Sequence, residues 1–208
     1  MNTDYPAACG LKQEETAMKK LVDAIRTQGV GIGEEIVKVD MFLNHRLDTE
    51  LVVEMGKAFA EAFADQKPDI VLTVEASGIA AALTTAMALG NIPVVFAKKS
   101  ATRNVTGEVY QSAVFSFTHG VENHVRVSKA YLPAGSRVLI IDDFLANGAA
   151  ASGLYDIVMQ AGCTVAGIGV CVEKVFQPGR QKLENMGCRV VSLARVIGID
   201  NGRLVVED

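Results

Sequence analysis

The sequence predicts an α/β protein with a mainly parallel central sheet. Short runs rich in valine and isoleucine alternate with segments whose apolar residues recur every three or four positions, the pattern of strands joined by helices. Runs such as 70–74 and 138–141 lack polar alternation, which is typical of strands that are buried on both faces. The chain has 208 residues, of which 50% are hydrophobic, so one sizeable core is expected and disorder is excluded as its main state.

In the first 70 residues, the apolar pattern indicates two helices and one strand. Apolar residues at i, i+3, i+4 and i+7 indicate a first helix, and an acidic or hydroxyl N-cap precedes a second. A glycine-rich stretch before the first strand is interpreted as a flexible linker, because a dinucleotide loop would follow a strand. In order, we expect a loose extension at 1–17, a helix from Met18 to a stop at Gly29, the linker at 29–33, a strand with mixed faces at 36–42, and a helix that begins at Asp48 or Thr49 and ends before Pro68.

From residue 70 onward, strands and helices alternate. Strands are expected at 70–74, 94–97, 113–117, 124–128, 138–143, 164–172 and 189–194, and a final hairpin joins 196–199 to 204–206. Ligands of parallel sheets bind beyond the carboxyl ends of the strands, which indicates the loops after Val74, Ala97, Ile141 and Val172. The polar loop 98–111 is longer than most connections and is therefore a candidate lid.

Charge and composition exclude several functions. The formal net charge is −4, from 20 basic and 24 acidic residues, which argues against partners such as nucleic acid or an anionic membrane. No signal peptide is expected, because residues 1–15 lack a basic start and an apolar core. No membrane span is expected either, because Gly90 and Pro93 break the uncharged run 76–97. The four cysteines lack metal-site spacing and are interpreted as reduced thiols, which indicates a cytoplasmic protein.

Residues 138–150 carry the strongest functional signal. A strand leads into Asp142 and Asp143, and the small-residue loop 146–150 follows at a helix start. Backbone amides of such a loop can converge on a phosphate, because no bulky side chain covers them. The paired carboxylates suit ribose hydroxyls or Mg²⁺, although they would equally suit a cap for the next helix.

This segment resembles the ribose-phosphate motif of the type I phosphoribosyltransferases. The segments 38–45, 75–80 and 173–180 are similar, in the same order, to the bacterial xanthine-specific branch of that family. The resemblance extends from about Met18 to Val206. It implies the type I phosphoribosyltransferase fold as a single domain at 18–208, a small hood subdomain formed by about 30–47 and 176–206, and a homodimer.

The resemblance also implies a reaction: the 5-phosphoribosyl group of 5-phosphoribosyl 1-diphosphate is transferred to xanthine. Mg²⁺ would be bound mainly through that donor, so no metal site is assigned to the protein. The implied site residues are Ala146, Asn147, Gly148, Ala149 and Ala150 for the 5′-phosphate, Ser77 and Gly78 for the diphosphate, Val37, Asn44 and Lys174 for xanthine, Asp142 and Asp143 facing the ribose, and Lys98, Lys99 and Arg103 closing over the diphosphate.

The chemistry explains these residue types. Diphosphate leaves C1 through a transition state with oxocarbenium character, so catalysis is mainly the placement of charge and the exclusion of water. Lys174 would donate to the 6-oxo group and Asn44 to the 2-oxo group, which hypoxanthine lacks. Residues 146–150 contain no hydroxyl, so backbone amides must dominate there, with Ser152 assisting. Phe144 or Phe176 would either stack on the base or belong to the core.

Two alternatives stay open. The same fold can act on hypoxanthine or guanine, or serve a regulator that senses the donor without turnover. Such regulators carry an N-terminal DNA-binding domain, and the roughly 17 residues before the first helix are too few for one.

Overall fold

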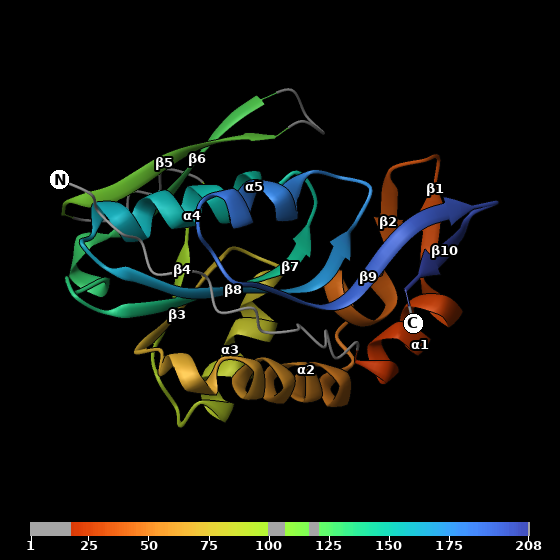
Figure 1. The fold of residues 1–208 in the computed structure, drawn as a ribbon, viewed down its shortest axis with the longest axis horizontal. Helices are drawn as coiled ribbons and strands as arrows, with labels where there is room; N and C mark the ends of the chain where they lie inside the picture. Colours follow the sequence, from red (N-terminus) through yellow and green to blue (C-terminus); the bar gives the residue numbers. More distant parts are fainter. Residues whose placement is uncertain (1–17, 100–106, 117–120, 208) are drawn as a thin grey trace, which may run out of the picture.

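The computed structural model, which describes residues 18–99, 107–116 and 121–207, contains a six-stranded sheet between two layers of helices (Figure 1). The sheet order is β10-β9-β8-β7-β3-β4, and every neighbouring pair is parallel except β9 and β10. The mainly parallel sheet predicted from the sequence is therefore confirmed. Its strands are β3 (Ile70–Val74), β4 (Val94–Ala97), β7 (Arg137–Leu145), β8 (Thr164–Lys174), β9 (Val190–Asp200) and β10 (Arg203–Val206).

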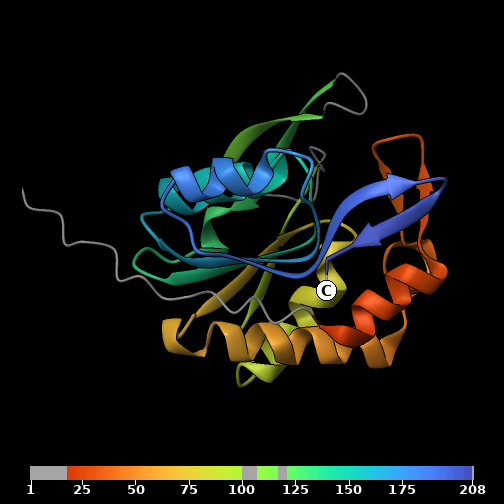
Figure 2. The same ribbon diagram turned by 45° about the vertical axis from the view of Figure 1, so that its right-hand side comes forward.

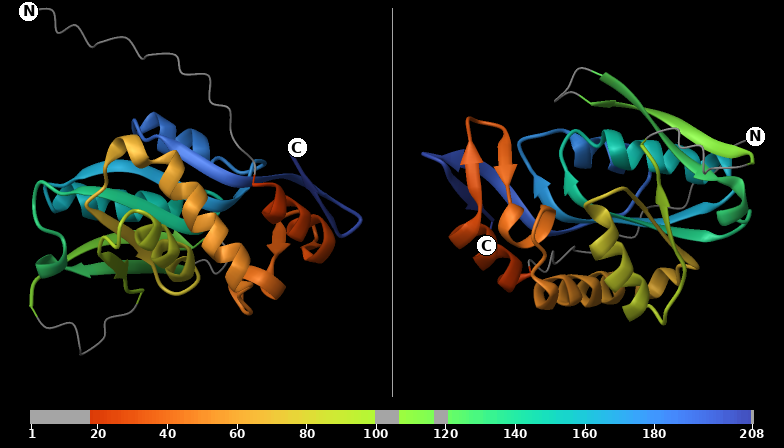
Figure 3. Two further views of the ribbon diagram at one scale, coloured as in Figure 1. Left: turned by 90° about the horizontal axis from the view of Figure 1, so that it is seen from below. Right: turned by 180° about the vertical axis from the view of Figure 1, so that it is seen from behind.

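Helices cover both faces of the sheet, as Figures 1 and 3 show. Successive side chains of the central strand β7 face opposite layers: Leu139 and Ile141 belong to one apolar cluster, and Val138 and Ile140 to the other. This double burial explains why the strand lacks polar alternation. On one face lie α2 (Thr49–Ala62) and α3 (Gly78–Ala88), and on the other α4 (Ala149–Gln160) and α5 (Gly179–Asn185).

The two N-terminal helices form where the sequence predicts them. α1 (Lys19–Gln28) buries Leu21 and Ile25 and ends at Gly29. Of the two candidate caps of α2, Asp48 is the N-cap, because its carboxylate accepts a hydrogen bond from the Leu51 backbone over 3.1 Å.

The linker prediction at 29–33 was wrong. These residues contain β1 (Val30–Ile32), which pairs with β2 (Ile36–Lys38) in an antiparallel hairpin. Gly31 is buried against Ile199, and a Cβ added at Gly31 would lie 2.3 Å from a methyl carbon of that side chain. The pairing of the hairpin is local, but Gly31 also packs against Ile199, 168 positions further along the chain (199 − 31), a contact that no local pattern records.

The predicted strand 36–42 was also too long. It stops at Lys38, and a single π-helical turn, η1 (Asp40–Asn44), follows. In a strand, Phe42 and Leu43 would face opposite sides, whereas the turn buries both, each 1% exposed, in the same apolar cluster.

Several other boundaries differ. The predicted loop 98–111 ends earlier, because β5 (Val109–Ser116) pairs with β6 (Val121–Ser128) in a separate antiparallel hairpin that begins before the expected strands 113–117 and 124–128. The two strands expected at 189–194 and 196–199 are one continuous strand, β9. The strand expected to end at Asp143 continues to Leu145. Short 3-10 turns, η2 (Ala64–Gln66) and η3 (Lys129–Tyr131), complete the described elements.

The topology reverses direction between β3 and β7. From β3 the chain crosses through α3 to β4 on one side, and from β7 it crosses through α4 to β8 on the other (Figure 2). The loops after these two strands therefore diverge to opposite faces and leave a crevice at their carboxyl ends, the usual ligand position in such sheets. None of the helices in the described part of the chain has the length and apolar character needed to cross a bilayer.

Candidate functional site

The predicted diphosphate-binding and ribose-facing residues meet at this switch point. Gly78 begins α3 directly after β3, and Asp142 lies near the end of β7. A Cβ at Gly78 would lie 2.9 Å from Asp142 Oδ1 and 2.3 Å from Thr73 Oγ1. Only glycine allows this approach, so α3 starts directly against the acidic pair.

The acidic pair is held in a low-dielectric environment. Asp142 and Asp143 are 4% and 8% exposed, and the Asp143 backbone donates to Asp142 Oδ1 over 3.0 Å. Burial, and next the neighbouring Asp143 charge, raise the pKa of Asp142 well above its usual range, while Lys99 opposes the shift. A positive centre brought to the pair would favour the ionised form of Asp142.

The predicted 5′-phosphate loop is a compact turn at the start of α4. Asn147 Oδ1 accepts a hydrogen bond from the Ala149 backbone over 2.9 Å, and Gly148 has φ +76°, which favours glycine. The Ser152 hydroxyl is buried and lies 3.9 Å from the Met186 sulfur, and its assistance to the loop stays a prediction. Backbone groups at the N-terminus of α4 are therefore the main phosphate-binding candidates.

Two of the three predicted xanthine-binding residues are held by hydrogen bonds to other segments of the chain. Asn44, the last residue of η1, donates from Nδ2 to Asp143 Oδ2 over 2.5 Å. Lys174, at the end of β8, donates to the Glu35 carbonyl oxygen over 2.9 Å and lies 5.7 Å from the centre of the Phe144 ring. Burial lowers the pKa of Lys174 from its ordinary value.

The remaining base-binding candidates differ in exposure. Val37 is 7% exposed and belongs to the apolar cluster beneath β2. Phe144 is half-buried and packs against the same cluster, whereas Phe176 is 38% exposed. Phe176 is thus the aromatic side chain with more of its surface available to a ligand.

The predicted lid residues begin where β4 ends. The backbone of Lys98 exchanges two hydrogen bonds with Arg126 of β6, and the Lys99 backbone donates to Glu75 Oε1 over 2.8 Å. Lys98 and Lys99 are therefore anchored through their backbones beside the loop after β3. Arg103 lies outside the described residues.

A buried ion-pair network, which no sequence pattern predicted, lies next to the site. Glu173, whose side chain is 3% exposed, accepts from Arg180 Nε over 2.9 Å, from Arg180 Nη2 over 2.6 Å and from Ser192 Oγ over 2.7 Å. Burial alone would raise the pKa of Glu173, but Arg180 and Ser192 outweigh it, so this pKa is lowered. The network attaches α5 to the ends of β8 and β9. The segment 173–180 contains both charged partners, yet no local pattern pairs them.

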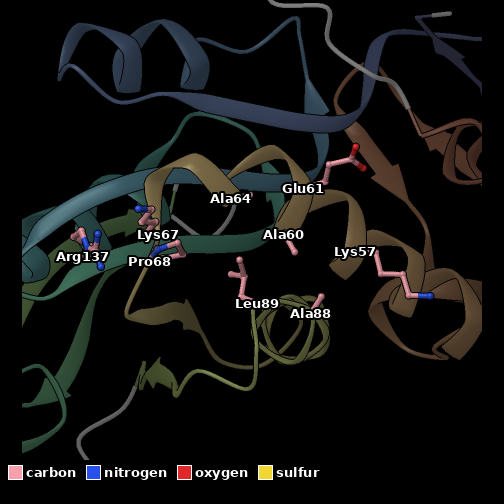
Figure 4. Close-up of a pocket in the computed structure, with 9 residues that line it drawn as sticks. All are labelled: Lys57, Ala60, Glu61, Ala64, Lys67, Pro68, Ala88, Leu89 and Arg137. Atoms are coloured by element: carbon pink, nitrogen blue, oxygen red, sulfur yellow. The ribbon is translucent and has the colours of Figure 1, made fainter.

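A separate cavity lies away from these residues. A cavity of about 640 Å³ opens between α2, the end of α3 and the amino end of β7 (Figure 4). Its lining residues are Lys57, Ala60, Glu61, Ala64, Lys67, Pro68, Ala88, Leu89 and Arg137. None of the predicted site residues lines this cavity, which lies at the opposite edge of the sheet from the switch point.

A resident metal centre is not visible in the parts of the chain that the structure describes. No group of three or more histidine, cysteine, aspartate or glutamate side chains there could hold a metal ion. The Asp142–Asp143 pair could at most add carboxylate oxygens to a cation that is already bound to a phosphate ligand, which is how Mg²⁺ usually reaches such sites.

The fold and the site together define a class of protein. An acidic pair at the switch point, followed by a small-residue loop at a helix N-terminus, is an arrangement that binds a phosphorylated sugar, and residues 46–202 match the phosphoribosyl transferase domain. The chain belongs to the phosphoribosyl transferase family.

The most similar proteins that we compared narrow the family to one group. The xanthine phosphoribosyltransferase of Laribacter hongkongensis is 50% identical over 190 residues, which cover 91% of this chain and 98% of that protein. The xanthine phosphoribosyltransferase of Streptococcus uberis is 49% identical over 187 residues, which cover 90% and 96%. The chain therefore belongs, within its family, to the xanthine phosphoribosyltransferases, and the family and fold class predicted from the sequence are both confirmed.

Solved structures agree on the fold. The crystal structure of adenine phosphoribosyltransferase from Thermoanaerobacter pseudethanolicus has a TM-score of 0.63 and 26% identity, covering 71% of this chain and 82% of that chain. The adenine phosphoribosyltransferase from Rhodothermus marinus has a TM-score of 0.68 and 22% identity, covering 87% and 99%.

Proposed function

We propose that this protein transfers the 5-phosphoribosyl group from 5-phosphoribosyl 1-diphosphate to xanthine, giving xanthosine 5′-phosphate and diphosphate in purine salvage. The observation that carries the proposal is the contact of Asn44 with Asp143. It joins a side chain expected to bind the base to the pair expected to face the ribose, and transfer requires these two ligands to be adjacent. The xanthine phosphoribosyltransferases at 49–50% identity support the same reaction.

The reaction breaks the bond between C1 of the ribose and the diphosphate oxygen and forms a bond between C1 and a purine ring nitrogen, which gives up its proton. The carboxylates of Asp142 and Asp143 would stabilise the positive charge that develops at C1. The backbone around Ser77 and Gly78, together with Lys98, Lys99 and Arg103, would hold the diphosphate as it leaves. Val37 and Lys174 would contact the base, and the loop 146–150 would hold the 5′-phosphate.

Several finer features belong to the same proposal. Mg²⁺ would enter on the diphosphate of the donor, and the adjacent carboxylates of Asp142 and Asp143 support this. The β1–β2 hairpin would serve as part of a hood over the base, which the bond from Lys174 to Glu35 supports.

A homodimer and a cytoplasmic location are also proposed. The unpaired thiols of Cys163, Cys171 and Cys188 support the location, because free thiols persist in reducing compartments.

A direct assay tests the reaction. Purified protein, Mg²⁺ and 5-phosphoribosyl 1-diphosphate are incubated with xanthine, guanine or hypoxanthine in parallel, and the three nucleotides are separated and quantified. We expect xanthosine 5′-phosphate to form with the highest kcat/KM. If guanine or hypoxanthine is turned over faster than xanthine, that base is the preferred substrate and the proposal is wrong. Donor binding without formation of any product would indicate a regulator.

A further inference from the structure

We propose that Asp143 is a specificity-determining positioning residue, which orients the Asn44 amide so that it recognises a base carrying a 2-oxo group. This inference rests on the proposed function and assigns to Asp143 a role beyond facing the ribose. Its basis is the 2.5 Å bond from Asn44 Nδ2 to Asp143 Oδ2, between residues 99 positions apart in the sequence.

The chemistry of the two groups decides how the amide faces. A carboxylate only accepts hydrogen bonds, so the NH₂ of Asn44, and not its oxygen, must be turned toward Asp143. A charge-assisted bond of this kind is among the stronger ones in proteins. Asp143 is 8% exposed and sits within the sheet, so it is a fixed anchor rather than a mobile partner.

The other polar atoms of the amide are the candidates for contact with the base. Asn44 Oδ1 is buried and has no hydrogen-bond partner among the described residues, and a buried acceptor without a donor is costly. In the proposed arrangement, the N–H trans to Oδ1 bonds Asp143, which leaves the N–H cis to Oδ1 on the same edge as that oxygen. Asn44 therefore presents a donor and an acceptor side by side.

Xanthine matches this edge in its neutral form. Its 2-oxo group accepts, and it is flanked on both sides by ring N–H groups that donate, so either side is complementary to the amide. Hypoxanthine has only a C–H at this position. Guanine has a 2-amino group, which on the side of its ring N–H presents two donors and no acceptor. If the Asn44 amide could rotate by 180° and exchange its oxygen and nitrogen, the discrimination between xanthine and guanine would weaken.

The test compares product binding, which does not depend on turnover. Calorimetry measures the Kd of wild type and Asp143→Asn for xanthosine, guanosine and inosine 5′-phosphates. An asparagine at 143 keeps the shape but can either donate or accept, so it no longer imposes one orientation. We expect the preference for xanthosine 5′-phosphate over each competitor to fall about tenfold, the size of a charge-assisted hydrogen bond.

The matched control is Asp142→Asn, the same chemical change at the adjacent residue, since the described side-chain hydrogen bond of Asn44 is to Asp143. It should change all three affinities by a similar factor. Asn44→Ala should also lose the preference, and the Asn44→Ala/Asp143→Asn pair should lose no more than Asn44→Ala alone. If Asp143→Asn does not fold by circular dichroism, Asp143→Ser takes its place.

An equal loss of all three affinities in the Asp143 variant, or an equal change of preference in Asp142→Asn, would overturn the positioning role. A wild-type protein that does not prefer xanthosine 5′-phosphate would instead overturn the proposed function, so the two failures are distinguishable.

Discussion

The backbone N–H of Gly179 donates to the carbonyl oxygen of Ala146 over 3.0 Å, so the loop after β7 rests directly on the first residue of α5. A Cβ at Gly179 would lie 2.3 Å from that oxygen and 2.9 Å from the Gly148 nitrogen. The shape of the proposed phosphate loop therefore depends on a glycine in another element.

Gly179→Ala should weaken donor binding selectively. The added methyl group must displace the loop 146–150, so we expect the KM for 5-phosphoribosyl 1-diphosphate to rise about tenfold, equivalent to ~1.4 kcal/mol, with a much smaller change for xanthine. Steady-state kinetics with each substrate varied in turn measures both. Gln181→Ala, on the exposed side of the same helix, is the control, and an equal rise in both KM values would contradict the assignment of the loop.

Gly78→Ala should destabilise the protein and lower its activity. The methyl group would meet Thr73 Oγ1 and the Asp142 carboxylate, both buried, and overpacking of this kind costs about 1–3 kcal/mol. Urea denaturation measures the loss. Gly198→Ala is the matched control, since a Cβ there meets no atom within 4 Å. Equal stability of the two variants would show that α3 can move away from Asp142.

Glu173→Gln should be strongly destabilising. It removes the buried carboxylate that pairs with Arg180 over 2.6 Å and with Arg195 over 3.3 Å, and breaking a buried pair costs about 3–5 kcal/mol. Glu108→Gln is the control, because Glu108 pairs with Lys129 on the surface and its side chain is 81% exposed. A double replacement of Glu173 and Arg180 by methionine should recover part of the loss, and no recovery would mean that the network's role is not mainly electrostatic.

The same network predicts an acid dependence. The pKa of Glu173 is lowered in the folded protein, so its contribution to stability is present above the ordinary glutamate value and is lost as the pH falls through the folded value. Wild type should therefore lose stability more steeply than Glu173→Gln below about pH 4.3, the unperturbed glutamate value. Denaturation midpoints measured from pH 7 down to pH 3 test this, and parallel curves would contradict it.

Asp142→Asn should have opposite effects on stability and activity. The pKa of Asp142 is raised in the folded protein, so its stabilising contribution is present below the ordinary aspartate value and is lost as the pH rises through the folded value. An amide avoids this loss, so the free variant should melt on the order of 2–4 °C higher at neutral pH, with the gain shrinking toward pH 4. Turnover should fall. A lower melting temperature at neutral pH would show that the ionised form is well accommodated.

Local patterns in the sequence were enough to predict most of the sheet and its helices. Uninterrupted apolar runs marked β3, β7 and β8, and the carboxylate of Asp48 marked the start of α2. The positions of Asp142, Gly78 and the loop 146–150 at strand ends also followed, because parallel strands bring their carboxyl ends to one edge. These features are encoded within a few residues of where they occur.

Only the tertiary structure decided the remainder. Gly31 of the β1–β2 hairpin packs against Ile199, Asn44 bonds to Asp143, and the packing of α5 places Arg180 beside Glu173. Each contact joins segments whose own patterns are compatible with other structures, so its free energy becomes available only when the sheet has brought them together. The sequence by itself determined which residues reach the switch point, and the packing between distant segments determined which of them touch.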